Sequence, residues 1–342
     1  MKKLNNSKVF IIAEAGVNHN GEIKKALELV KIAKKAGADA VKFQLFNVDE
    51  QVSILAKNAS YQIKGSKKEN MIEMAKDYEF SWKNHIQIKK LCDKLKIEYL
   101  ASCCDIDAIN FLVNRIKAKK IKISSGEITN FKLIKHADTK KNPIILSTGM
   151  ATLREIKQAV KYIKNKKKLI LLHCVSNYPT DISNVNLLII NTLRNTFGCK
   201  IGFSDHTVGN EAAFLSVALG AKYIEKHFTI NKNLKGPDHA MSLNPTELKR
   251  FIKKVRLAEK ILGRDDKNSI STKEKYIKKI ARRGIISISS IKKNQKLSIK
   301  NISIKRPLKG IDAKFIDRVI DRRAKKDIPI NTPITWKLVK SK

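Results

Sequence analysis

Short apolar segments alternate with amphipathic helical patterns along most of this chain, and this alternation limits the folds open to it. Eight such segments occur between Val9 and Gly263, namely Val9–Ala15, Asp39–Gln44, Tyr99–Cys103, Lys120–Ser125, Pro143–Thr148, Leu169–Cys174, Lys200–Asp205 and Ala221–Thr229. Parallel strands that are buried on both faces have this near-continuous apolar character. Eight strand–helix units predict an α/β fold, a (β/α)8 TIM barrel, with an open doubly wound sheet as the alternative.

The stretches between these segments place apolar residues at helical spacing. Helices are expected at Ile23–Lys35, Trp82–Lys94, Asp105–Arg115, Leu153–Lys164 and Asn210–Leu219, with Pro245–Leu262 as the closing helix. The connection from Asn47 to Phe80 is long for a barrel of this kind. It is open to two interpretations, a substrate-gripping lid or a poorly ordered insertion.

The pattern changes after Gly263. A polar stretch rich in Lys, Asp and Ser follows, and then short β-like pieces occur at Arg283–Ile288 and Leu297–Ile304. This organisation predicts a barrel over residues 1–263, a linker over 264–279 and a small β-rich domain over 280–342. A domain of roughly 60 residues buries little core alone, so we expect it to dock on a barrel, its own or a partner's.

The chain is strongly basic, with 71 Lys and Arg against 31 Asp and Glu, a net charge of +40. The lysines are scattered and aromatic residues make up only 6%, so a solvated surface is the simpler interpretation. A basic nucleic-acid-binding protein is the alternative from another class. Five cysteines without metal spacing, and an apolar run from Val9 that Glu14 ends, predict a cytoplasmic protein without a membrane span.

Barrel enzymes carry their chemistry at the carboxyl ends of the strands, and polar residues gather there in this sequence. They are Glu14, Lys42, Gln44, Ser102, Lys122, Ser125, Ser147, Ser176, Tyr178, Asp205, His206, Glu225 and His227. Lys42 and Lys122 would lie inside the barrel, where an ammonium group needs an anion. Protein carboxylates could supply it, but the neighbouring serines favour a bound phosphate and carboxylate.

Two histidines end the last two predicted strands. Glu225 and His227 are two residues apart, so both side chains face the same side, and His206 ends the preceding strand. Two imidazoles beside an acid are typical of a divalent-metal site left open for substrate. Water and substrate oxygens completing an octahedron would suit Mn²⁺ or Mg²⁺ better than a closed zinc site.

A series of ordered motifs gives the chain a family resemblance. They are Ala13–Gly21, Val41–Gln44, Lys122–Glu127, Ile145–Met150, Leu172–Cys174, Gly202–Thr207, Ile224–Thr229 and Gly236–His239. Together they closely resemble the bacterial sialic acid synthases, and the carboxyl-terminal part looks like that family's antifreeze-like (SAF) domain. The resemblance covers almost the whole chain.

The resemblance implies a transferase for surface glycans such as lipopolysaccharide or capsule. It would condense phosphoenolpyruvate with N-acetylmannosamine, or a related acylated mannosamine, to give an N-acetylneuraminate-type sugar acid and phosphate. An N,N'-diacetyllegionaminic acid synthase using 2,4-diacetamido-2,4,6-trideoxymannose is the alternative. A divalent metal, Mn²⁺ with Mg²⁺ or Co²⁺ as alternatives, and a domain-swapped homodimer are also implied.

The resemblance assigns a role to each site residue. Glu14 and Glu225 match catalytic acids, and His206 and His227 match the metal ligands. The positions that match phosphoenolpyruvate contacts are Lys42, Ser102, Lys122, Ser125, Ser147, Ser176 and Tyr178. The positions on the sugar side are Gln44, Asp238 and Arg306, of which Arg306 would enter the neighbouring subunit's site.

Three segments depart from the family pattern. Ser102-Cys103-Cys104 replaces Ser/Thr-Pro-Phe, and Leu308-Lys309 follows Arg306-Pro307 in place of Gly-Asn. Ser176 stands where some relatives have Asn. The first two departures bear on how Ser102 and Arg306 are presented.

Overall fold

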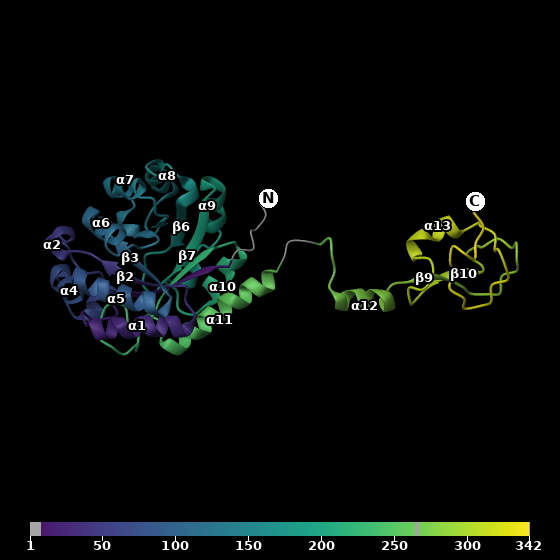
Figure 1. The fold of residues 1–342 in the computed structure, drawn as a ribbon, viewed down its shortest axis with the longest axis horizontal. Helices are drawn as coiled ribbons and strands as arrows, with labels where there is room; N and C mark the ends of the chain where they lie inside the picture. Colours follow the sequence, from purple (N-terminus) through teal and green to yellow (C-terminus); the bar gives the residue numbers. More distant parts are fainter. Residues whose placement is uncertain (1–7, 264–266, 342) are drawn as a thin grey trace. The chain divides into compact units, whose positions relative to one another are not determined.

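The computed structural model describes residues 8–263 and 267–341. Its first unit contains a closed barrel of eight parallel strands in sequence order, seen with its surrounding helices in Figure 1. The strands are β1 (Phe10–Gly16), β2 (Ala40–Leu45), β3 (Glu98–Cys103), β4 (Ile121–Ile123), β5 (Ile144–Ser147), β6 (Leu169–Cys174), β7 (Lys200–Asp205) and β8 (Tyr223–His227). The barrel prediction is confirmed, and the open doubly wound sheet is wrong.

Helices cover the outside of the barrel and bury their apolar faces on it. They are α1 (Ile23–Ala36), α5 (Trp82–Leu95), α6 (Ile106–Asn114), α7 (Phe131–Thr139), α8 (Leu153–Lys161), α9 (Ile189–Phe197), α10 (Glu211–Ala218) and α11 (Pro245–Leu262). Asn244 and Glu247 form a capping box at the start of α11, which fixes where that helix begins. Among the described residues, no helix is both long and apolar enough to cross a membrane.

The barrel closes where β1 pairs with β8. Glu14 lies opposite His227 on one side and opposite Lys42 of β2 on the other. Asp39 supports this closure from outside, because it accepts hydrogen bonds from the backbone N–H of Ile11 at 2.9 Å and from Arg256 at 2.6 Å. The first, second and last strands are therefore held in a register that places their polar ends at one level.

The connection between β2 and α5 is folded. It forms three short helices, α2 (Val48–Gln51), α3 (Ser60–Ser66) and α4 (Met71–Tyr78). Two glycines let this segment approach the barrel loops, since a Cβ on Gly65 would collide with the Gly236 carbonyl and one on Gly21 with the Asp77 carbonyl. We call residues 47–80 the lid segment. The interpretation of this connection as a poorly ordered insertion is wrong, because it forms three helices.

A second compact unit follows residue 264. It contains α12 (Thr272–Ala281), the antiparallel pair β9 (Gly284–Ser287) and β10 (Ile302–Lys305), and α13 (Ile316–Val319), around a small core of its own. The stretch expected to be a linker over 264–279 is helical from Thr272. The capping box of Ser271 with Glu274 starts this helix, and no side chain of it is buried.

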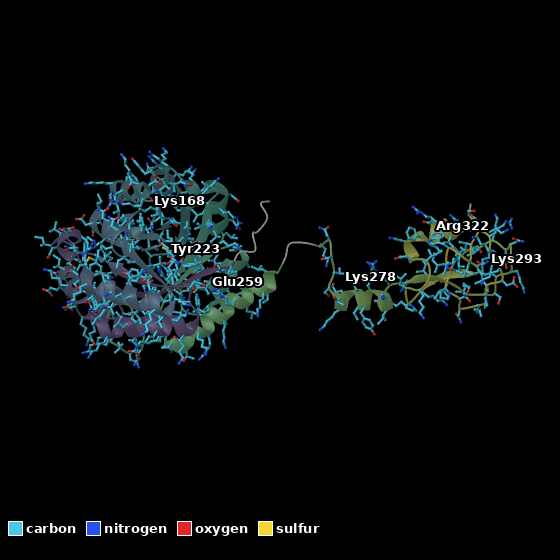
Figure 2. The ribbon with its side chains drawn as sticks, in the orientation of Figure 1. Lys168, Tyr223, Glu259, Lys278, Lys293 and Arg322 are labelled. Atoms are coloured by element: carbon cyan, nitrogen blue, oxygen red, sulfur yellow. The ribbon has the colours of Figure 1, made fainter. Side chains whose placement is uncertain are left out.

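Most of the lysine excess lies on the surface. Figure 2 labels Lys278 and Lys293 on the second unit, and both are exposed. Within the described part of the chain only Lys42, Lys122 and Lys226 are buried lysines. A buried ammonium group needs an anionic or hydrogen-bonding partner, so the surroundings of these three lysines have to account for their burial.

Candidate active site

A cavity of about 580 Å³ opens at the carboxyl ends of the barrel strands. The barrel residues to which a role was assigned all line it, namely Glu14, Lys42, Gln44, Ser102, Lys122, Ser125, Ser147, Ser176, Tyr178, His206, Glu225, His227 and Asp238. Asp205, also predicted at this face, is not among the lining residues and pairs with Lys226 instead. Arg306 belongs to the second unit and is exposed there. The size is typical of a pocket for small molecules.

Two carboxylates and one lysine form the floor of the cavity. Lys42 Nζ lies 2.9 Å from Glu225 Oε2 and 3.5 Å from Glu14 Oε2, and all three side chains are buried. Glu14 and Glu225 reach this point from the first and last strands because β1 pairs with β8. Part of the anionic partner that Lys42 requires is thus supplied by the protein itself.

The two carboxylates differ in protonation. Burial raises the pKa of Glu14 to about 8. Burial also raises the pKa of Glu225, but Lys122 and Lys42 outweigh it and lower the value to about 2. Near neutral pH, Glu14 is therefore a protonated acid and Glu225 a carboxylate, a division that suits one proton donor and one acceptor.

Among the described residues, no carboxylate is in direct contact with Lys122. Its ammonium donates to Ser147 Oγ at 2.6 Å and to the Ile123 carbonyl at 3.3 Å. Burial lowers its pKa to about 8. A buried cation whose direct hydrogen-bond partners are neutral oxygens is a strong site for an incoming anion.

Small polar groups gather next to this lysine around Gly149. The Gly149 N–H donates to Ser125 Oγ at 3.0 Å, and Ser125 Oγ lies 3.2 Å from Cys174 Sγ. A Cβ at position 149 would collide with Ser176 Oγ. The side chains of Ser125, Cys174 and Ser176 therefore fill the space beside the glycine, and their hydroxyl and thiol groups form a compact polar cluster at the edge of the cavity.

His206 and His227 face each other across the β7–β8 side of the cavity. Their ring centres are 5.7 Å apart. His206 Nδ1 donates to the Val175 carbonyl at 2.7 Å, which leaves Nε2 as an acceptor for the Tyr178 hydroxyl at 3.0 Å. Burial lowers the pKa of His206 to about 4 and the pKa of His227 well below its ordinary value, so both imidazoles are neutral.

Neutral imidazoles are the form that binds metal ions. His227 Nδ1 is buried without a hydrogen-bond partner and lies 3.8 Å from Asp238 Oδ2. Among the described residues, no group of three or more His, Cys, Asp or Glu is arranged to hold an ion. His206 and His227 are the imidazoles in the cavity that could hold a divalent ion, with water and substrate as further ligands.

Asp238 is aimed into the cavity by a tightly bonded turn. Its carbonyl accepts from Ser242 Oγ at 2.6 Å, and His239 bonds to Thr229 Oγ1 at 2.7 Å and to Asn20 Oδ1 at 2.9 Å. Burial raises the pKa of Asp238 to about 6.

Some cavity residues were not predicted from the sequence. Ser204 donates to Glu225 Oε1 at 3.0 Å, and Cys174 contacts Ser125. Both stand two residues before a predicted site residue, so strand alternation could have identified them. The lid segment also contributes Met74 and Tyr78, for which the sequence carries no such signal.

Comparisons with known proteins agree with this geometry. The NeuB family model matches residues 29–267, and the SAF domain model matches residues 282–340. The chain is 39% identical to N,N'-diacetyllegionaminic acid synthase of Legionella pneumophila, over 97% of this chain and 95% of that protein. The synthase of the same name from Campylobacter jejuni is also 39% identical, over 94% of this chain and 98% of that protein.

A solved structure gives the same result. The N-acetylneuraminic acid (sialic acid) synthetase of Leptospira borgpetersenii superposes with a TM-score of 0.71 at 36% identity, covering 80% of this chain and 91% of that one. The family match spans most of the barrel, and the SAF match covers the second unit. The chain therefore belongs to the NeuB family of sialic acid synthases and ends in a SAF domain.

Proposed function

We propose that the protein condenses phosphoenolpyruvate with an N-acylated mannosamine-type sugar and water, giving a nine-carbon 2-keto sugar acid and phosphate. N-acetylmannosamine and 2,4-diacetamido-2,4,6-trideoxymannose are the two candidate sugars. One observation carries the proposal. Lys122 and the hydroxyl groups of Ser125 and Ser147 form an anion site in the same cavity as a carboxylic acid, a carboxylate and two neutral imidazoles.

Phosphoenolpyruvate occupies the side of the cavity formed by β2 to β6. Lys42 and Lys122 neutralise its charges, and the hydroxyl groups around them donate to its oxygens. Those hydroxyls belong to Ser102, Ser125, Ser147, Ser176 and Tyr178.

Glu14 and Glu225 divide the proton transfers. The methylene carbon of phosphoenolpyruvate attacks the sugar's aldehyde carbon, and Glu14, protonated near neutral pH, donates a proton to the new alkoxide. Water then adds at C2 while ionised Glu225 accepts its proton. The tetrahedral intermediate then loses phosphate with cleavage of the C–O bond. Its C2 hydroxyl becomes the ketone and returns a proton to Glu14, while Glu225 gives its proton to the leaving phosphate.

His206 and His227 hold the divalent metal in this proposal, with Mn²⁺ preferred to Mg²⁺ or Co²⁺. A bound ion would polarise the aldehyde oxygen as a Lewis acid. The hydrogen bond from His206 Nδ1 to Val175 supports the role, because it leaves Nε2 unprotonated, and a bound ion would take the place of the Tyr178 hydroxyl there.

Gln44 and Asp238 contact the sugar, and Arg306 meets its N-acyl group from the second copy of a domain-swapped homodimer. Exposed apolar side chains on α12, Tyr276, Ile277 and Ile280, support self-association. The five cysteines are all unpaired, which supports a reducing, cytoplasmic location. The alternative of a nucleic-acid-binding protein lacks support. Two of the three buried lysines, Lys42 and Lys122, line the cavity, Lys226 pairs with Asp205, and the other lysines are scattered along the chain.

Phosphate release from phosphoenolpyruvate tests the proposal. With Mn²⁺ present, we expect release that depends on one of the two sugars and that falls at least 100-fold in Lys122→Met. Release at the same rate without sugar, or none with either sugar, would refute it. Lys278→Ala, on an exposed turn of α12, is the matched control for removal of a lysine.

A further inference from the structure

The side chain of Asn18 is fully buried in the turn that follows β1. Its backbone N–H donates to the Ala15 carbonyl at 2.9 Å, which ties the turn to the end of the strand. Asn18 lies in the motif Ala13–Gly21, but the resemblance assigned no role to it, and it is not among the residues that line the cavity. Any effect of its amide on the reaction must therefore pass through other residues.

The amide of Asn18 donates two hydrogen bonds. Its Nδ2 lies 2.8 Å from the Phe228 carbonyl and 2.9 Å from Ser242 Oγ. The single hydroxyl hydrogen of Ser242 is directed at the Asp238 carbonyl, at 2.6 Å, so this hydroxyl accepts from Asn18. Asn18 Oδ1 is buried and, within the described residues, has no hydrogen-bond partner. A leucine at this position would remove that unpaired acceptor, which is costly to bury, but would also lose both donated bonds.

The first of these bonds fixes the segment that carries His227. Phe228 directly follows His227, and its N–H donates to the Glu14 carbonyl at 2.9 Å. The carbonyl of Phe228 accepts from Asn18. The carbonyl of His227 itself accepts from the Leu243 N–H at 2.9 Å. Strand β1 and the turn after it therefore hold both polar backbone groups of the residue next to the imidazole.

The second bond fixes the turn that carries Asp238. Ser242 is fully buried, and its hydroxyl joins the amide of Asn18 to the Asp238 backbone. The carboxylate of Asp238 in turn faces the imidazole, since Oδ2 lies 3.8 Å from His227 Nδ1. One buried amide is thus bonded to the segments of two cavity residues that lie next to each other.

We propose that Asn18 is a positioning residue that sets the separation between His227 and Asp238. It does so without contacting a substrate, because its amide reaches the first residue through Phe228 and the second through Ser242. A displacement of roughly 1 Å in a catalytic site can cost about 100-fold in rate. The inference rests on the proposed function, in which His227 binds the metal ion and Asp238 contacts the sugar.

Asn18→Leu tests the proposal, because it keeps the size of the side chain and removes both donors. We expect the Kd for Mn²⁺, measured from the free-ion signal in electron paramagnetic resonance, to rise about tenfold. The KM for the sugar that supports phosphate release should also rise about tenfold. The KM for phosphoenolpyruvate should change less than about twofold, because its proposed contacts come from β2 to β6.

Ser242→Ala separates the two bonds. It removes the link from Asn18 to Asp238 and leaves the bond from Asn18 to Phe228 in place. We therefore expect the KM for the sugar to rise as in Asn18→Leu, whereas the Kd for Mn²⁺ stays within about twofold of the wild-type value.

Asn58→Leu is the matched control. Asn58 is also buried, its Nδ2 donates to the Lys68 and Asn70 carbonyls at 2.9 and 3.3 Å, and its Oδ1 has no hydrogen-bond partner within the described residues. It belongs to the lid segment and is not among the residues that line the cavity. The substitution removes the same groups, so an unchanged Kd for Mn²⁺ is expected.

A folded Asn18→Leu protein with the wild-type Kd for Mn²⁺ and the wild-type KM for the sugar would overturn the proposal and leave the proposed function standing. If Asn18→Leu does not fold, an unchanged KM for the sugar in Ser242→Ala would overturn it instead. Absence of phosphate release with either sugar in the wild-type enzyme would overturn the proposed function. The Kd for Mn²⁺ would then still decide whether Asn18 positions His227.

Discussion

Lys226 Nζ lies 2.9 Å from Asp205 Oδ2, and the two residues are register partners on β8 and β7. Each precedes one of the two cavity histidines, and both side chains are almost fully buried. Lys226 also donates to the Thr207 carbonyl at 2.6 Å. This pair fixes β7 against β8 behind His206 and His227.

Lys226→Met should therefore lower the free energy of unfolding by about 3 kcal/mol, because Asp205 keeps a buried charge without its partner. Urea unfolding monitored by circular dichroism would measure the loss. Lys8→Met removes the exposed end of the Lys8–Asp39 pair and should cost less than about 1 kcal/mol. Equal losses in the two variants would mean that burial of the pair is unimportant.

Activity should depend steeply on pH above neutrality. Burial holds the pKa of Lys122 and the pKa of Glu14 each at about 8, so the ammonium and the neutral acid are present below pH 8 and both are lost above it. We expect kcat/KM for phosphoenolpyruvate to fall by up to about 100-fold per pH unit in the alkaline range. Lys122→Arg keeps its charge there and should reduce the slope to about tenfold. A flat profile between pH 7 and 9.5 would contradict both assignments.

Removal of one imidazole should remove metal binding without unfolding the protein. In His227→Ala we expect the affinity for Mn²⁺ to fall at least about 100-fold, since one of two protein ligands is lost. Titration of the free-ion signal of Mn²⁺ by electron paramagnetic resonance measures this independently of turnover. His136→Ala, on α7 outside the cavity, is the control. Unchanged affinity in His227→Ala would place the metal elsewhere.

The exposed apolar side chains of α12 should be covered in the homodimer. Tyr276 and Ile280 are 65% and 49% exposed and lie four residues apart, on one face of the helix. Replacing both with lysine should shift the protein from dimer to monomer in light scattering after gel filtration. Lys278→Ala should leave the dimer intact. A wild-type monomer at micromolar concentration would refute the dimer itself.

The barrel and most of its site were predictable because each depends on local pattern. Buried parallel strands have near-continuous apolar sequences, and their ends mark the active face, so Lys42, Lys122 and His227 could be named before any coordinates. The protonation of Glu14 and Glu225 could not be predicted, since their pKa values depend on burial, on the distances to the two lysines and, for Glu225, on a hydrogen bond from Ser204.

In the lid segment the spacing of apolar residues did not predict which side chains line the cavity. Met74 and Tyr78 face the cavity because α4 packs against Gly21, a contact between residues distant in sequence. Helical spacing alone assigns an apolar face but not the surface that it meets. The helix α12 is a different case, because the capping box of Ser271 and Glu274 was available as a signal.

The pairing of β1 with β8 also sets an order for synthesis. Glu225 joins Lys42 only after the last strand has left the ribosome, although Lys42 itself emerges early. A nascent chain that ends before Tyr223 holds Lys42 and Lys122 without the carboxylate that lowers the cost of burying them. In such a chain we expect the ammonium groups of Lys42 and Lys122 to stay in contact with water. Strand β8 therefore closes the barrel and also supplies Glu225 and His227. We expect a barrel that lacks this strand to be inactive.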